Sequence, residues 1–145
     1  MTDKLSPAQR SRLMGKVKRR DTIPELLVRK YLHAAGYRFR VDVAKLPGRP
    51  DIVMRKFKTA IFIHGCFWHG HENCSLFKIP KTRTDWWQAK IDRNRSRDAA
   101  AIEALREEGW RVWVIWECEL KKRRRGATLH HLLESLVALE YPAEL

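Results

Sequence analysis

Four stretches of the chain carry apolar residues at the spacing of β-strands. Tyr37–Val43 alternates apolar and charged residues, which predicts a half-exposed strand. Asp51–Met54 begins a second strand, and Arg55–Lys58 turns the chain back into Thr59–Ile63, which predicts a hairpin. Trp110–Trp116 is rich in tryptophan, valine and isoleucine, so we expect it in the centre of the same sheet.

Helical spacing of apolar residues predicts helices around these strands. Thr22 and Glu25 form a capping box that begins one helix, and Gly36 ends it. Residues 85–108 form a long helix and residues 127–139 a C-terminal helix. The positions expected to be buried are Leu26, Leu27, Tyr31 and Leu32 in the first helix and Leu129, Leu132, Leu133, Leu136 and Val137 in the last. Strands and helices together predict an α/β fold.

The composition is typical of one soluble domain. The chain has 145 residues, of which 44% are hydrophobic and 10% aromatic, enough for one sizeable core. No apolar run approaches the ~20 residues that span a bilayer, and no signal-peptide core follows the polar start. We expect a single cytoplasmic domain over residues 1–145, with a basic arm at residues 1–20 and a basic loop and helix at residues 121–145.

The charge changes this picture. A formal net charge of +13 and a pI of about 10.2 predict strong, salt-sensitive binding to a polyanion. Nucleic acid is the favoured partner, and the protein would then associate with the nucleoid; the alternative is a basic surface that only maintains solubility. A membrane surface fits less well, because no strongly amphipathic helix places bulky apolar residues opposite a basic face.

Two basic segments are candidates for contact with DNA. Residues 6–20 read as a short helix on which Leu13, Met14 and Val17 share one face. That face either docks on the domain or belongs to an arm that inserts an apolar side chain into DNA, and the sequence favours neither. Residues 121–125, KKRRR, form an exposed charge run that can also touch phosphates.

The stretch after the apolar run Ala60–Ile63 is dense in metal ligands. The candidates are Cys66, His71, Cys74 and, far downstream, Cys118. Three cysteines in a cytosolic chain argue against disulfides, and thiolates with an imidazole suit a closed, tetrahedral, structural zinc site. The alternative is three buried thiols and a polar histidine, and His64 or His69 can also replace His71 as the ligand.

If His71 binds zinc, two histidines and one carboxylate remain for catalysis. Asp51 can hold Mg²⁺, which polarises a phosphate. One of His64 and His69 can accept a proton from the attacking water, and the other can stabilise charge or protonate the leaving group. The alternatives are a turn-forming aspartate and two structural histidines. Asp51 also reaches His64 only if the hairpin pairs in a suitable register.

Aromatic residues occur beside the positive charge. Phe67 and Trp68 lie in the predicted loop, and Trp86 and Trp87 open the basic half of the long helix. Six tryptophans can mean only a large core, but aromatic rings next to cations also suit base stacking or intercalation.

Six motifs occur in order from about Arg12 to about Leu120. They are RDT, LPGRPDIV, IFIHGCFWHGHENCSLFK, TRTDWW, GWRV and IWEC. They resemble the very-short-patch-repair (Vsr) DNA mismatch endonucleases, and HGCFWHGH is specific. The C-terminal helix matches only in character.

The resemblance implies a restriction-endonuclease-like fold, with a central mixed sheet, flanking helices and a structural zinc site. It implies Mg²⁺-dependent nicking of one strand, 5′ to the thymine of a T:G mismatch. Such mismatches arise when 5-methylcytosine deaminates in a methylase site. The implied substrate is double-stranded DNA, the implied partners are mismatch-repair proteins and a DNA polymerase, and a monomer suffices for one nick.

The resemblance also implies roles for residues matched by position. The catalytic set is Asp51, whose carboxylate binds Mg²⁺ together with the backbone carbonyl of Ile63, His69 as general base, and His64 and Glu25. The zinc ligands are Cys66, His71, Cys74 and Cys118. The DNA contacts are Phe67, Trp68 and Trp87 as wedges, Met14 from the opposite groove, and Lys90 and Asn94 reading the mismatched pair.

Two functions from different classes therefore remain. One is the mismatch-nicking enzyme, and the other is a zinc-stapled DNA-binding module, or an altered relative, that binds without cutting. Asp51, His64 and His69 favour the enzyme, because a pure binding module does not need them.

Overall fold

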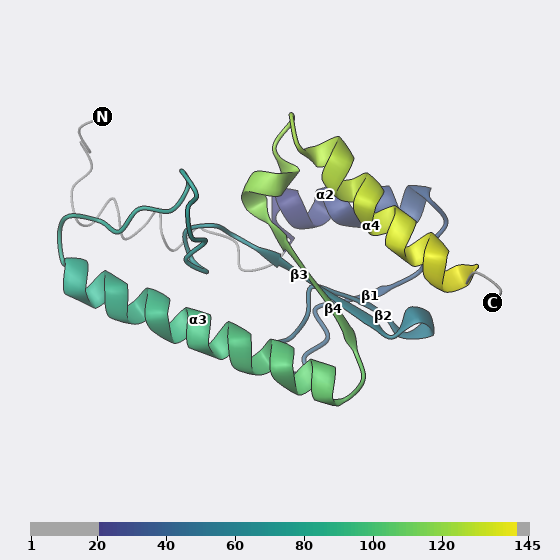
Figure 1. The fold of residues 1–145 in the computed structure, drawn as a ribbon, viewed down its shortest axis with the longest axis horizontal. Helices are drawn as coiled ribbons and strands as arrows, with labels where there is room; N and C mark the ends of the chain where they lie inside the picture. The colour runs from purple at the N-terminus through teal and green to yellow at the C-terminus, as the bar shows by residue number, and fades with distance from the viewer. Residues whose placement is uncertain (1–20, 142–145) are drawn as a thin grey trace.

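The computed structural model describes residues 21–141, which form a sheet between two helical layers (Figure 1). The helices are α2 (Ile23–Ala34), α3 (Thr84–Glu107) and α4 (Arg125–Glu140), the strands are β1 (Arg40–Val41), β2 (Ile52–Met54), β3 (Thr59–His64) and β4 (Arg111–Trp116), and the 3₁₀ turns are η1 (Arg55–Phe57) and η2 (Glu117–Leu120). The predicted helix over residues 6–20, including Met14, lies outside the described residues. None of the described helices has both the length and the apolarity needed to cross a membrane.

The four strands form one mixed sheet in the order β1-β2-β3-β4. β1, β2 and β3 pair antiparallel, whereas β3 and β4 pair parallel, with His64 opposite Trp116. The predicted α/β fold and the β2–β3 hairpin are confirmed. The prediction that β4 is central is wrong, because β4 forms one edge of the described sheet and β3 lies inside it.

β4 looks central in the sequence because helices cover both of its faces. Val112 and Val114 pack on the α3 side, and Trp113 and Ile115 pack on the other side. Apolar residues at successive positions therefore report burial on two faces, which an edge strand also achieves when helices flank it.

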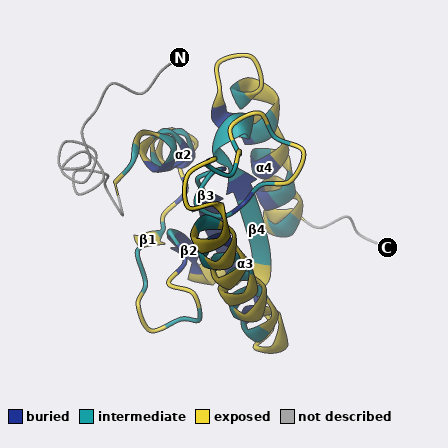
Figure 2. Ribbon diagram, turned by 90° about the vertical axis from the view of Figure 1, so that its left-hand side faces the viewer, coloured by how far each residue is buried: buried dark blue, intermediate teal, exposed yellow. Residues whose placement is uncertain are grey.

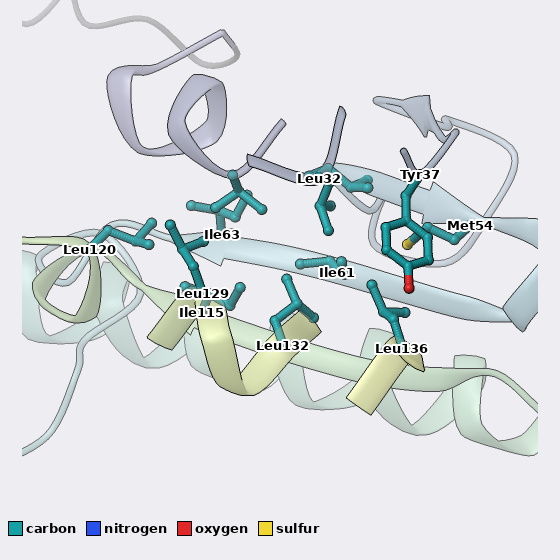
Figure 3. Close-up of a cluster of buried hydrophobic side chains, with 12 residues drawn as sticks. Leu32, Tyr37, Met54, Ile61, Ile63, Ile115, Leu120, Leu129, Leu132 and Leu136 are labelled. Carbon is teal, nitrogen blue, oxygen red and sulfur yellow. The ribbon is translucent and has the colours of Figure 1, made fainter. Parts of the chain in front are cut away.

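The larger core lies between the sheet and the layer of α2 and α4 (Figure 3). Val28 and Leu32 come from α2, and Leu129, Leu132 and Leu136 come from α4. The smaller core lies under α3, around Phe62, Leu105 and Trp110. Figure 2 shows that burial is concentrated at β2 and β3, whereas β1 and much of the surface of the helices are exposed.

Two predicted faces are partly wrong. Leu26 is 47% exposed and Val28 is buried in its place, so the buried face of α2 runs through positions 25, 28 and 32. Val137 is 42% exposed, although the other predicted positions of α4 pack inward. Tyr37–Val43 is a strand only at Arg40–Val41, because Asp42, at φ +47°, leaves the extended conformation.

The α4 face supplies a stability test. Leu132→Ala should lower the free energy of unfolding by about 2–5 kcal/mol, because Leu132 is fully buried and its loss leaves a cavity. Val137→Ala, on the exposed side of the same helix, should change it by about 0.5 kcal/mol or less. Urea denaturation of the full chain measures both values. Equal effects would contradict the packing of α4 described here.

Candidate active site and metal centre

A polar pocket of about 530 Å³ opens where β3 ends. Its walls come from α2, from the segment between β1 and β2, from the end of β3 and from α3. The lining residues are Glu25, Asp42, Gly48, Arg49, Asp51, Phe62, Ile63, His64, His69 and Asp98. Four of the predicted catalytic residues and the predicted backbone ligand therefore share one cavity with two further acids.

Hairpin register places Asp51 in this pocket. Ile52 pairs with Ile61, so Asp51, just before β2, lies beside the last residues of β3. Its Oδ2 accepts a hydrogen bond from the backbone N–H of Ile63 at 2.6 Å. The register required to bring Asp51 towards the histidines is thus the register observed.

Three carboxylates gather on one side of the pocket. One oxygen each from Glu25, Asp42 and Asp51 lies within 4.8 Å of the others. The pKa of Asp51 is raised to about 7, mainly by burial and also by the charges of Glu25 and Asp42, while the hydrogen bond from Ile63 opposes the shift. Crowded carboxylate oxygens are the ligands that a hard divalent cation prefers, and such a cation would relieve their repulsion.

Glu25 faces this cluster from the first turn of α2. Thr22 Oγ1 accepts from the Glu25 N–H, as the predicted cap requires, but the Glu25 carboxylate accepts from the N–H of Asp21 at 2.8 Å rather than from Thr22. Arg29 lies one turn later, and its Nη2 is 3.3 Å from Glu25 Oε2 and 3.7 Å from Asp42 Oδ2. Glu25 is therefore more than a capping residue, because the same side chain borders the pocket.

His64 and His69 stack on the other side of the pocket. Their rings are 3.8 Å apart between centroids and 2° from parallel. His69 Nδ1 lies 2.6 Å from Asp98 Oδ2, so an Nδ1–H donates to the carboxylate and Nε2 remains free to accept a proton. Burial, with His69 alongside, lowers the pKa of His64 to about 4, which keeps that ring neutral.

The four predicted zinc ligands also meet. Three of them lie in the loop that follows β3, and Cys118 lies in η2. One ligand atom each from Cys66, His71, Cys74 and Cys118 lies within 4.8 Å of the others. His71 Nδ1 is 3.5 Å from the Sγ atoms of both Cys66 and Cys118. Zinc bonds of about 2.3 Å to sulfur and about 2.0 Å to nitrogen, at a tetrahedral angle, place the sulfur and the nitrogen about 3.5 Å apart. The residues therefore fit a structural zinc ion, and this geometry selects His71 over His64 and His69.

Trp116 links the two clusters. Its ring stacks on His71 at 4.0 Å and 5°, and it meets His64 edge-on at 5.2 Å. Beyond it, the carboxylate of Glu117 accepts the N–H of Cys66, and the N–H of Cys118 points at the Cys66 sulfur. The end of β4 thus braces both the candidate zinc centre and the histidine pair.

An aromatic cluster lies on the outer side of the loop. Trp87 contacts Phe67 at 5.4 Å and Trp68 at 6.0 Å between ring centroids, and Trp86 is 43% exposed next to them. Asn94 Nδ2 donates to the Trp68 carbonyl at 2.8 Å. Lys90 Nζ lies 6.0 Å from the Trp86 ring. The structure thus brings together every described residue predicted to contact DNA.

Known proteins are similar in sequence to this chain. Residues 2–75 match the family model described as DNA mismatch endonuclease Vsr. The chain is 52% identical over 120 residues to the type II nicking enzyme V.XorIIP of Xanthomonas oryzae, covering 83% of this chain and 88% of that protein. It is 46% identical over 125 residues to the DNA mismatch endonuclease Vsr of Escherichia coli, covering 86% and 80%. The chain belongs to the Vsr DNA mismatch endonuclease family. The resemblance noted in the sequence is therefore confirmed, and DNA is the substrate class of this Vsr family.

The structure of this Vsr family member adds three residues that the sequence reading missed. Asp98 orients His69, Arg29 joins the carboxylates, and Trp116 bridges the two clusters. Asp98 had one signal, since it follows Lys90 and Asn94 at intervals of four residues and so shares their face of the helix. Trp116 had none beyond a strand pattern, because its partners are distant in sequence.

The zinc centre predicts a stability change. Cys118→Ser should remove bound zinc and lower Tm by about 10 °C or more, because a structural metal contributes folding free energy directly. Zinc stoichiometry by plasma mass spectrometry and thermal unfolding measure the two effects. A strong chelator should lower the Tm of the unaltered protein to the same range and leave the variant unchanged. Unaltered zinc content in the variant would refute Cys118 as a ligand.

Proposed function

We propose that this chain is a Mg²⁺-dependent endonuclease that nicks one DNA strand 5′ to the thymine of a T:G mismatch left by 5-methylcytosine deamination. The observation that carries the proposal is one pocket that holds Asp51 among carboxylates and His69 bound to Asp98. The names of the relatives add support, since one is a DNA mismatch endonuclease and others are nicking enzymes.

Asp51 and the backbone carbonyl of Ile63 would hold the magnesium ion, with Glu25 alongside. Carboxylate and carbonyl oxygens suit this ion. The pKa of Asp51 is raised first by burial and then by the charges of Glu25 and Asp42, and a bound cation would offset both effects. When bound, Mg²⁺ polarises the scissile phosphate and stabilises the negative charge that develops there.

His69 is the proposed general base. Asp98 holds its Nδ1–H, so Nε2 can take a proton from the attacking water, and the carboxylate stabilises the imidazolium that forms. His64 keeps the His69 ring in place by stacking. Its low pKa favours this neutral, supporting role over delivery of a proton to the leaving group.

The aromatic cluster and the positive charge would act on the duplex. Phe67, Trp68 and Trp87 are proposed to wedge into the DNA beside the mismatch, because half-exposed rings near cations can part stacked bases. Lys90 and Asn94 are proposed to read the mismatched pair, and Met14 to enter from the opposite groove. The zinc centre of Cys66, His71, Cys74 and Cys118 would keep the wedge loop rigid.

Several further features belong to the same proposal. The mixed sheet with Asp51 at the head of its hairpin supports a restriction-endonuclease-like fold. The protein would act as a monomer in the cytoplasm, at the nucleoid, and hand its nick to a DNA polymerase and mismatch-repair proteins. The competing function is a zinc-stapled module that binds DNA without cutting, and the aromatic cluster would serve that function equally well.

A nicking assay separates the two functions. Duplexes with T:G, T:A or C:G at one position, in several methylase contexts and with each strand end-labelled, are incubated with Mg²⁺. We expect cleavage only in the thymine strand of T:G. Asp51→Ala should abolish nicking but retain zinc and mismatch binding, whereas Glu103→Ala, at an exposed glutamate on α3, should leave nicking unchanged. Mismatch-selective binding without a cut in any context would establish the binding module instead.

The pairing of His69 with Asp98 gives a separate prediction. Asp98→Asn should slow single-turnover nicking by about 10²-fold or more, because an amide no longer selects the correct tautomer of His69 or stabilises its cation. Affinity for the mismatched duplex and zinc content should stay within about twofold. A rate close to that of the unaltered protein would rule out His69–Asp98 as the base.

A further inference from the structure

Three side chains of α3 hold three consecutive residues of the loop that follows β3. The pairs are Asn94 with the Trp68 carbonyl, Asp98 with the His69 ring, and Arg95 with the Gly70 carbonyl. Arg95 makes two hydrogen bonds to the Gly70 carbonyl, because both Nε, at 2.9 Å, and Nη2 donate to this oxygen. α3 therefore holds the loop at residues 68–70.

Gly70 is shaped for this contact. It has φ +61° and is buried, and a Cβ at this position would lie 2.5 Å from Arg95 Nε and 2.5 Å from Ile91 Cγ2. No other residue both adopts this conformation readily and leaves room for the guanidinium. Gly70 also lies between His69 and His71. A contact that fixes its carbonyl therefore restrains the backbone of both the proposed base and the candidate zinc ligand.

The Arg95 side chain is turned inward. It is 31% exposed, its guanidinium carbon lies 5.2 Å from the centroid of the Phe77 ring, and its Nη1 is 3.9 Å from Asp92. An arginine on a basic helix of a DNA-binding protein is ordinarily a phosphate contact. Arg93 and Arg97, on the same helix, are exposed, whereas the Nε and Nη2 donors of Arg95 are directed at the protein's own backbone.

We propose that Arg95 is a positioning residue, which fixes His69 for the reaction through the carbonyl of Gly70 instead of binding DNA. His69 is then held at two points, its ring by Asp98 and its following peptide by Arg95. Losing the second point lets the peptide move, and displacements of about 1 Å at a reacting group can cost about 10²-fold in rate. The kinetic consequence rests on the proposed function, but the structural clamp does not.

The test compares Arg95→Met with Arg93→Met, which removes the same charge from the outer side of the same helix. Arg95→Met should lower the single-turnover nicking rate by about 10- to 100-fold while Kd for the T:G duplex and its salt dependence stay unchanged. Arg95→Lys should recover part of the rate, because an ammonium donates to the same carbonyl. Arg93→Met should leave the rate unchanged.

A structural readout keeps this test independent of nicking. In histidine side-chain ¹H–¹⁵N spectra of the full, zinc-loaded protein, Arg95→Met should shift the His69 signals, assigned with His69→Gln, and Arg93→Met should not. If the unaltered protein does not nick, the proposed function fails and these spectra alone decide the clamp. Unmoved His69 signals would overturn the proposal. The proposal would also be overturned if Arg95→Met weakened binding to the duplex, lowered the salt dependence of binding by about one phosphate contact and left the nicking rate unchanged. Those three results together would identify Arg95 as a phosphate contact.

Discussion

The pairing of β3 with a different neighbour on each side is the constraint on which the whole site depends. Antiparallel pairing with β2 sets Asp51 beside Ile63, and parallel pairing with β4 sets His64 beside Trp116. The β2 side therefore supplies Asp51 to the carboxylate cluster, and the β4 side supplies Cys118, two residues after Trp116, to the candidate zinc centre. A slip of one residue in either pairing would turn these side chains to opposite faces of the sheet and dissolve the site.

The clustered carboxylates of the pocket repel one another, and Arg29 or a bound cation can offset this repulsion. Three carboxylates lie together in a partly buried space, and Arg29 is the cation that the described residues place among them. Burying like charges raises the pKa of Asp51 and Glu25, whereas burial lowers the pKa of His64. Such opposed shifts within one cavity are characteristic of functional sites rather than of a core optimised for stability.

The loop after β3 combines two functions that require different degrees of order. Its aromatic residues Phe67 and Trp68 remain partly exposed, as the proposed contact with DNA requires, while His69, as the proposed base, needs a fixed geometry. The ligand cluster anchors the loop to the end of β4, and α3 anchors it from the side through Asn94, Arg95 and Asp98. Because the anchors converge on residues 68–71, the backbone around the histidine is held while the aromatic tips remain accessible.

Local patterns in the sequence determined a large part of this protein. The helices at residues 23–34, 84–107 and 125–140 and the hairpin follow from periodicity and capping, and the cysteine and histidine spacing identified a cluster of side chains that could hold a metal ion. These predictions succeeded because their signals are carried by residues within a few positions of one another. The motifs likewise identified the family, since they report chemistry rather than shape.

Only the tertiary structure decided the features that depend on distant partners. The edge position of β4, the exposure of Leu26 and Val137, and the roles of Asp98 and Arg95 all depend on which surfaces meet after folding. Apolar residues on a strand show that its faces are buried but do not show which strands lie beside it. An aspartate or arginine on a charged helix looks solvated until the loop that it binds, more than 20 residues away, is placed against it. These contacts join residues that are far apart in the sequence, so a local pattern does not predict them.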